Sequence, residues 1–236
     1  MDKQLARIGF GTSAVLFGGG AALLALATQV VIPRLIILTT AEPIIAWFVA
    51  ASLCLFVPLL LAGAWLLASE YRYGRPWSER LRLRPMDKRD WRLALGGLVV
   101  IALLSGGCVV FLHSLGQEQG LHPAFMAMQP VTPGRAWILG AWLPFFLLNI
   151  LGEELVWRGV VLPRQELVFG RWAWLVNGTG WWLMHLAFPW QVLLTLLPTV
   201  LVVPYVAQRS QNTWVGIIVH AALNGSAFLM LAFGLA

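Results

Sequence analysis

Residues 151–164 read Leu-Gly-Glu-Glu-Leu-Val-Trp-Arg-Gly-Val-Val-Leu-Pro-Arg. This stretch places two adjacent carboxylates, Glu153 and Glu154, and the guanidinium of Arg158 inside a strongly apolar chain. An ionisable side chain at membrane depth costs roughly 2.5–3.5 kcal/mol on insertion scales and usually marks function. Glu154 and Arg158 are i and i+4 on a helix and can pair, whereas Glu153 lies about 100° further round. The stretch therefore predicts one carboxylate held by an ion pair and one kept for chemistry.

The whole chain has the composition of a polytopic membrane protein. Of its 236 residues, 59% are hydrophobic and 11% are charged, and the mean hydropathy is +0.79. Apolar runs of roughly 18 residues or more recur along it, which predicts transmembrane helices, and the short alternating segments of a barrel strand are missing from the sequence. We therefore predict an all-α bundle in the lipid bilayer, with about seven transmembrane helices in a single transmembrane domain (1–236).

Seven apolar segments are the expected spans. They cover residues 8–32, 44–68, 93–112, 136 through the acidic stretch, 172–188, 192–207 and 214–235. We expect Pro33 and Arg34 to close the first span. That span exceeds the roughly 7–15 apolar residues of a signal peptide, so we expect it to be retained, with cleavage as the alternative. Six or eight spans are the alternative counts, because the region of the fifth and sixth spans is short.

The basic residues predict how the chain is oriented. The net charge is +6, and arginines concentrate in the connection 69–92. Cytoplasmic loops are enriched in such residues, so we expect this loop and the N-terminus inside, and residues 113–135 and the C-terminus outside. Basic residues that lie between apolar runs fit topology signals, so we expect no nucleic-acid partner.

Cysteines and histidines limit the other chemistries. Cys54 and Cys108 lie within apolar runs without ligand spacing, and we expect them to be packing residues rather than a disulfide or a metal pair. The four histidines, at 113, 122, 185 and 220, form no His-Glu-x-x-His motif. No Gly-x-Ser-Gly and no Gly-x-Gly-Asp sequence occurs, so a serine or aspartate intramembrane protease would lack its residues.

The last three expected spans contain few strongly polar side chains, and these recur at helical spacing. Trp181 precedes His185 by one turn, and His220 and Asn224 are i and i+4 on one face. A lone histidine in a membrane helix is more often a packing residue than a catalyst. Two histidines, an asparagine and a Glu-Glu pair in one small bundle instead favour a common site.

A hairpin would bring the acidic stretch and the first of these histidines together. If the fourth and fifth spans turn near Phe169, Glu153 and His185 each lie 16 residues from the turn, which is about 24 Å along a helix. Counting from Ala136 instead puts Glu153 rather close to the inner surface. A helix break near residues 149–152 would resolve this conflict.

Such residues could hydrolyse a peptide bond within the membrane. A buried carboxylate can act as the general base for water, and a neighbouring histidine can share its proton. A second histidine and a carboxamide can donate hydrogen bonds to the developing oxyanion. The same Glu, His and His set could hold a zinc ion with water in the fourth position. The residues alone leave both mechanisms open.

The motifs resemble those of the CPBP family, the CAAX prenyl proteases and bacteriocin-processing enzymes that are also called Abi. Glu153, Glu154 and Arg158 match its Glu-Glu-x-x-x-Arg motif. His220 and Asn224 match its His-x-x-x-Asn motif. Each motif alone is a weak signal, whereas all of them in order at membrane depth are specific.

The remaining motif, Phe-x-x-x-His, departs from the family pattern. It is present as Trp181-x-x-x-His185, so an aromatic residue and the histidine are kept. The resemblance covers about residues 137–228, which we expect to be the catalytic core. The earlier spans resemble the family only in being hydrophobic.

The resemblance implies an intramembrane endopeptidase with six site residues, Glu153, Glu154, Arg158, His185, His220 and Asn224. The first glutamate would activate water with help from the first histidine. The second histidine and the asparagine would form the oxyanion site. The second glutamate and the arginine would hold the helix and shape the cavity.

The resemblance also frames the alternatives. Eukaryotic prenyl-protease members look like metal-independent glutamate proteases, so we expect no cofactor, with zinc as the alternative. A non-catalytic membrane scaffold or bacteriocin-immunity protein is a second class of function, and a transporter with a buried proton relay is a third. The expected partner is a peptide or protein substrate, either soluble or membrane-bound, and the expected location is a bacterial inner membrane.

Overall fold

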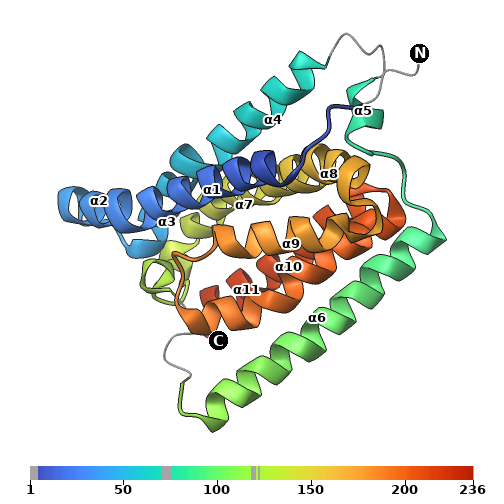
Figure 1. Cartoon of the computed structure of the whole chain (residues 1–236). Helices are drawn as coiled ribbons and strands as arrows, with labels where there is room; N and C mark the ends of the chain where they lie inside the picture. The colour runs from blue at the N-terminus through green and yellow to red at the C-terminus, as the bar shows by residue number, and fades with distance from the viewer. Residues whose placement is uncertain (1–4, 71–75, 118–120, 122, 236) are drawn as a thin grey trace.

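The computed structural model describes residues 5–70, 76–117, 121 and 123–235, and all regular structure within them is helical (Figure 1). Six helical stretches in this part are long and apolar enough to cross a membrane. They are Phe10–Thr39, Pro43–Ser69, Lys88–Ser114, Trp137–Met184, Trp190–Ser210 and Thr213–Ala232. The predicted all-α bundle is confirmed, and the protein is an integral, multi-pass membrane protein.

The fourth stretch folds back on itself, so the fourth and fifth of the seven predicted spans both fall largely within this one stretch. α7 (Trp137–Glu154), a π-helical segment (Leu155–Val161) and α8 (Leu162–Phe169) run in one direction. Gly170 then turns the chain with φ +53° and ψ −128°, a conformation that is essentially restricted to glycine. α9 (Ala173–Met184) runs back along α8, so the hairpin predicted near Phe169 is present. With 12 residues, α9 is shorter than the roughly 20 needed to span alone.

The first stretch corrects the prediction that Pro33 and Arg34 end the first span. α1 (Phe10–Leu26) continues through a π-helical turn (Ala27–Val31) into α2 (Ile32–Thr39). Proline removes one backbone donor and crowds the preceding turn. The wider π-helical turn just before Pro33 accommodates this, so the helix passes through.

A π-helical segment followed by a proline occurs at two further places in the described chain. A π-helical segment (Ser52–Phe56) joins α3 (Pro43–Ala51) to α4 (Val57–Ser69), and Pro58 follows it directly. The π-helical segment before α8 likewise precedes Pro163. A proline at the second position of the following helix thus accompanies each of these widened turns.

The helices pack around an aromatic-rich core. α6 (Lys88–Ser114) lies along α10 (Trp190–Ser210) and α11 (Thr213–Ala232), and α1 packs on α9 (Figure 1). α7 contacts α3, α4 and α11. Trp157 and Trp181 are among the largest fully buried side chains. The acidic stretch therefore lies in the interior of the bundle, away from the lipid-facing surface.

Ion pairs tie together the end of the bundle that carries the basic connection. Arg164 donates two hydrogen bonds to Glu70, and Arg82 donates two to Glu166 at 2.7 and 2.8 Å. Burial alone would raise the pKa of Glu70, but the hydrogen bonds and charge of Arg164 and the N–H of Ala6 hold it below its usual value. Residues 71–75 of this connection lie outside the described residues, as do 118–120 and 122 of the expected outer loop.

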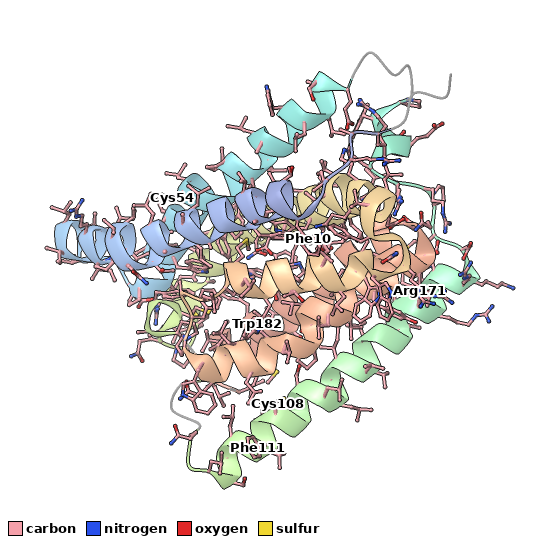
Figure 2. The ribbon with its side chains drawn as sticks, viewed as in Figure 1. Phe10, Cys54, Cys108, Phe111, Arg171 and Trp182 are labelled. Carbon is pink, nitrogen blue, oxygen red and sulfur yellow. The ribbon has the colours of Figure 1, made fainter. Side chains whose placement is uncertain are left out.

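The two cysteines are free thiols. Cys54 and Cys108 are each partly buried and lie on different sides of the bundle (Figure 2). Cys54 packs against the buried core, as expected of a small packing residue.

Candidate active site

The acidic stretch adopts a π-helical turn at the point where its charges lie. Glu153 and Glu154 end α7, and Arg158 lies within the π-helical segment that follows. π-helical turns inside α-helices are rare and frequently occur at functional sites. The helix break suggested near residues 149–152 is absent, because α7 continues through them; the irregularity begins one residue after Glu154.

Glu154 is fully buried and is held by two cationic or polar partners. Its Oε1 lies 3.1 Å from Nη1 of Arg158, so the i,i+4 pair predicted from the sequence is present. The same oxygen lies 2.9 Å from Nδ1 of His220. This second contact links α7 to α11 and was not predicted from the sequence.

Gly216 makes room for this carboxylate. A Cβ atom at position 216 would lie 2.5 Å from Oε2 of Glu154, which is closer than real Cβ contacts. Gly216 lies one turn before His220, so both residues present the same face of α11 to Glu154. Gly216 was not predicted from the sequence; the signal that could have found it is its place four residues before His220 and eight before Asn224, on the same helix face.

His220 and Asn224 form a chain of hydrogen bonds that begins at Glu154. An ionised carboxylate only accepts, so the hydrogen of neutral His220 is on Nδ1 and Nε2 accepts. Nδ2 of Asn224 lies 3.1 Å from Nε2 and donates to it. Both ring nitrogens of neutral His220 are therefore engaged. The arrangement differs from the predicted pair of parallel donors, because His220 orients the amide of Asn224.

Trp181 lies at the centre of the predicted site residues. Its indole Nε1 donates to Oε2 of Glu153 at 2.5 Å. The guanidinium carbon of Arg158 lies 3.7 Å from the centroid of the indole ring, a cation–π contact. The rings of His185 and His220 meet the indole edge-on, with centroids 5.8 and 5.2 Å away. Trp181 was predicted only as an aromatic replacement for Phe; its indole N–H, a donor that Phe lacks, was not predicted to bind Glu153.

His185 joins the site through this tryptophan. It caps the C-terminal end of α9, and its Nδ1 lies 2.7 Å from the carbonyl oxygen of Trp181. A carbonyl oxygen only accepts, so Nδ1 donates and Nε2 of the neutral ring is an acceptor. Among the described residues, no hydrogen bond joins His185 to Glu153. The structure thus brings the two side chains to the same indole without a direct bond between them.

An aromatic cavity of about 150 Å³ adjoins these residues. Its walls come mainly from α3, α7 and α11, with Trp142 and Phe228 stacked at a centroid distance of 4.5 Å. Its two carboxamides are Asn224 and Asn149, which lies one turn before Glu153. Oδ1 of Asn149 is buried and accepts no hydrogen bond within the described chain. The cavity therefore combines apolar walls with amide groups next to the glutamates.

The Glu, His and His set that would hold zinc in the alternative mechanism does not form a ligand set in this arrangement. Within the described ranges, no three His, Cys, Asp or Glu side chains come close enough together to hold a metal ion. Oε2 of Glu153 faces the indole N–H, and both nitrogens of His220 are already engaged. The donors present do not fit the tetrahedral site that zinc requires.

Comparison with known families supports the motif assignment. Residues 135–226 match the model of a family described as type II CAAX prenyl endopeptidase, Rce1-like. These limits agree within two residues at each end with the 137–228 core expected from the motifs, and all six predicted site residues fall inside them. No curated protein and no solved structure matches the chain.

Proposed function

Because residues 135–226 match the model of the Rce1-like type II CAAX prenyl endopeptidase family, we propose that the chain is an intramembrane endopeptidase in which Glu153 activates water. The different surroundings of the two glutamates carry this proposal. Arg158 and His220 hold Glu154, which is 0% exposed. Oε2 of Glu153 accepts a hydrogen bond from the indole of Trp181, and Oε1 of Glu153 makes no hydrogen bond in the described chain. Oε1 is therefore the carboxylate oxygen available to a water molecule.

The proposed reaction begins with proton transfer from water to Oε1 of Glu153. The water oxygen attacks the scissile carbonyl carbon, and the C=O becomes an oxyanion. One hydrogen of the Asn224 amide is donated to His220, and the second amide hydrogen can be donated to that oxyanion. The proton then passes from Glu153 to the leaving amine, the C–N bond breaks, and an acid and an amine are released. Nε2 of His185 is an acceptor that can hold the proton between these steps.

Glu154, Arg158 and His220 act as positioning residues in this scheme. The carboxylate fixes the tautomer of His220, and His220 fixes the amide plane of Asn224. Arg158 balances the buried charge of Glu154, since an unpaired buried carboxylate would be costly. Preorganised donors of this kind stabilise a transition state without reorganising during the reaction.

The aromatic cavity is proposed to hold the substrate next to the scissile bond. Its apolar walls suit an aromatic or long aliphatic side chain. Oδ1 of Asn149 has no hydrogen-bond partner in the described chain, so it can accept a hydrogen bond from a backbone N–H of the bound substrate. Without such an acceptor, the substrate N–H would be buried in the membrane with no hydrogen bond. We therefore propose an apolar peptide segment at the membrane as substrate, with no metal cofactor.

The test compares the protein termini in membranes of cells that produce the wild-type chain or Glu153→Gln. Mass spectrometry of terminal peptides should reveal termini that depend on Glu153 and that persist when membranes are incubated with EDTA. Glu79→Gln, an exposed carboxylate near the basic connection, is the control and should leave the termini unchanged. Identical termini from the wild-type chain and Glu153→Gln would instead support a non-catalytic membrane scaffold.

A further inference from the structure

Two adjoining grooves lie at the end of the bundle that carries the basic connection, away from the proposed active site. The first, of about 510 Å³, lies where α8 meets α9 and where α10 meets α11. Its lining includes Arg171 and Arg209 (Figure 2 shows Arg171 at the α8–α9 junction). The second, of about 530 Å³, runs between α6 and α10. Trp174 and Tyr205 line both grooves, so one molecule can occupy the two together.

The arginines of the first groove have no carboxylate partner. Both side chains are exposed, and no ion pair engages Arg171 or Arg209 among the described residues. Arg171 lies over the ring of Trp172, with its guanidinium carbon 5.1 Å from the centroid. Glu166 lies on adjacent α8, but Arg82 binds both of its carboxylate oxygens. The groove therefore presents two uncompensated guanidinium groups.

The second groove is mainly apolar, and its lining includes two adjacent glycines, Gly96 and Gly97. Gly96 of α6 lines it, and a Cβ atom added there would meet no other atom within 4 Å. Leu201 and Val202 of α10 form part of the opposite wall. Arg92, exposed near the N-terminal end of α6, adds a third basic residue to the lining of this groove. The mainly apolar lining of this groove suits a hydrocarbon tail rather than a polar ligand.

We propose that these grooves bind one anionic phospholipid, with its phosphate on Arg171 and Arg209 and an acyl chain between α6 and α10. Guanidinium groups bind phosphate through paired hydrogen bonds. Tryptophan and tyrosine side chains favour the headgroup level of a bilayer, as Trp174 and Tyr205 would here. Basic pockets between transmembrane helices on the cytoplasmic side favour anionic headgroups. The continuous apolar groove favours a lipid over free phosphate as the source of that headgroup.

The first experiment measures lipid retention by native mass spectrometry of the purified full chain. The probes are dioleoylphosphatidylglycerol and dioleoylphosphatidylcholine, with inorganic phosphate as a separate arm. We expect the wild-type chain to retain the anionic lipid, and Arg171→Gln/Arg209→Gln to lose roughly tenfold or more of that retention, since each basic residue at the surface contributes several-fold. The control, Arg7→Gln/Lys88→Gln, removes the same charge from exposed residues and should retain the lipid.

The second experiment blocks the acyl groove without touching the arginines. Gly96→Phe should fill it and lower retention of the anionic lipid, because the added ring enters open space. Gly106→Phe is the matched control, also in open space on α6 but outside the groove. Melting in detergent checks that each variant is folded. The proposal is overturned if both lipids are retained equally, if Gly96→Phe behaves as its control, or if phosphate alone competes as well as the lipid.

Discussion

The indole Nε1 of Trp181 donates a hydrogen bond of 2.5 Å to Oε2 of Glu153, the carboxylate that is proposed to activate water. The bond leaves Oε1 as the oxygen open to water and fixes the plane of the carboxylate. The matched family motif has Phe at this position, which has no donor. The proposed base is thus held by the indole N–H of Trp181, a donor that a Phe at this position would not provide.

Replacing this tryptophan separates the donor from the ring. Trp181→Phe keeps an aromatic ring beside Arg158 and His185 but removes the hydrogen bond to Glu153. We expect turnover to fall about 10- to 150-fold, because a hydrogen bond to a charged group contributes roughly 1.5–3 kcal/mol. The measurement is kcat of the purified variant on a cleaved peptide.

The neighbouring tryptophan provides the control for that variant. Trp182 donates its indole N–H to the carbonyl oxygen of Leu193 at 2.9 Å, away from the glutamates. Trp182→Phe therefore removes a comparable bond and should keep near-normal kcat. Equal kcat values for Trp181→Phe and Trp182→Phe would contradict the proposal that Trp181 positions Glu153.

Glu154→Gln should destabilise the protein. The change leaves the guanidinium of Arg158 buried without its counter-charge, which costs about 3–5 kcal/mol. It also disturbs the bond to His220. Thermal melting in detergent should show a marked fall, and a melting temperature equal to that of the wild-type chain would refute the structural role of Glu154.

Gly216→Ala tests the close approach between α11 and the acidic stretch. The added methyl group would lie 2.5 Å from Oε2 of Glu154, so helix or carboxylate must shift. We expect lower melting and lower turnover. Gly225→Ala on the same helix is the control, because its nearest contact, Phe146 at 3.5 Å, is ordinary van der Waals packing. Equal melting temperatures for Gly216→Ala and Gly225→Ala would contradict the close contact between Gly216 and Glu154.

Stability should fall in acid because of the ion pair between Glu70 and Arg164, at the end of the bundle that carries the basic connection. The pKa of Glu70 is lowered in the folded chain from its usual value of 4.5. A lowered pKa contributes stability that is present above about pH 4.5 and is lost as the pH falls through the folded pKa. Melting measured from pH 6 downward should show this loss, and Glu70→Gln should flatten it. An unchanged acid dependence in Glu70→Gln would exclude this origin.

The sequence predicted the parts of the site that depend on local spacing. The Glu154–Arg158 pair follows from i,i+4 geometry, and the turn near Phe169 follows from the lengths of the apolar runs. The continuation of the first helix past Pro33 was not predicted, because a proline usually ends a helix and only the adjacent π-helical turn accommodates it.

Side-chain contacts between different helices could not be predicted from the helical spacing of residues in the sequence. The bond from His220 to Glu154 depends on how α11 is rotated against α7, and Gly216 allows that approach. The bond from Trp181 to Glu153 depends on how α9 is placed against the end of α7. A helical pattern gives the face on which a residue lies but not the atom it meets on a neighbouring helix.

Turnover and melting of purified Glu153→Gln, measured beside the wild-type chain, test the central claim most directly. A general base typically contributes 10²–10⁴-fold, so turnover should fall by about that factor. Melting should stay unchanged or rise slightly, because a buried base is usually held at a cost to stability. Near-normal turnover, or a loss of stability large enough to explain lost turnover, would contradict the assignment of Glu153 as the water-activating base.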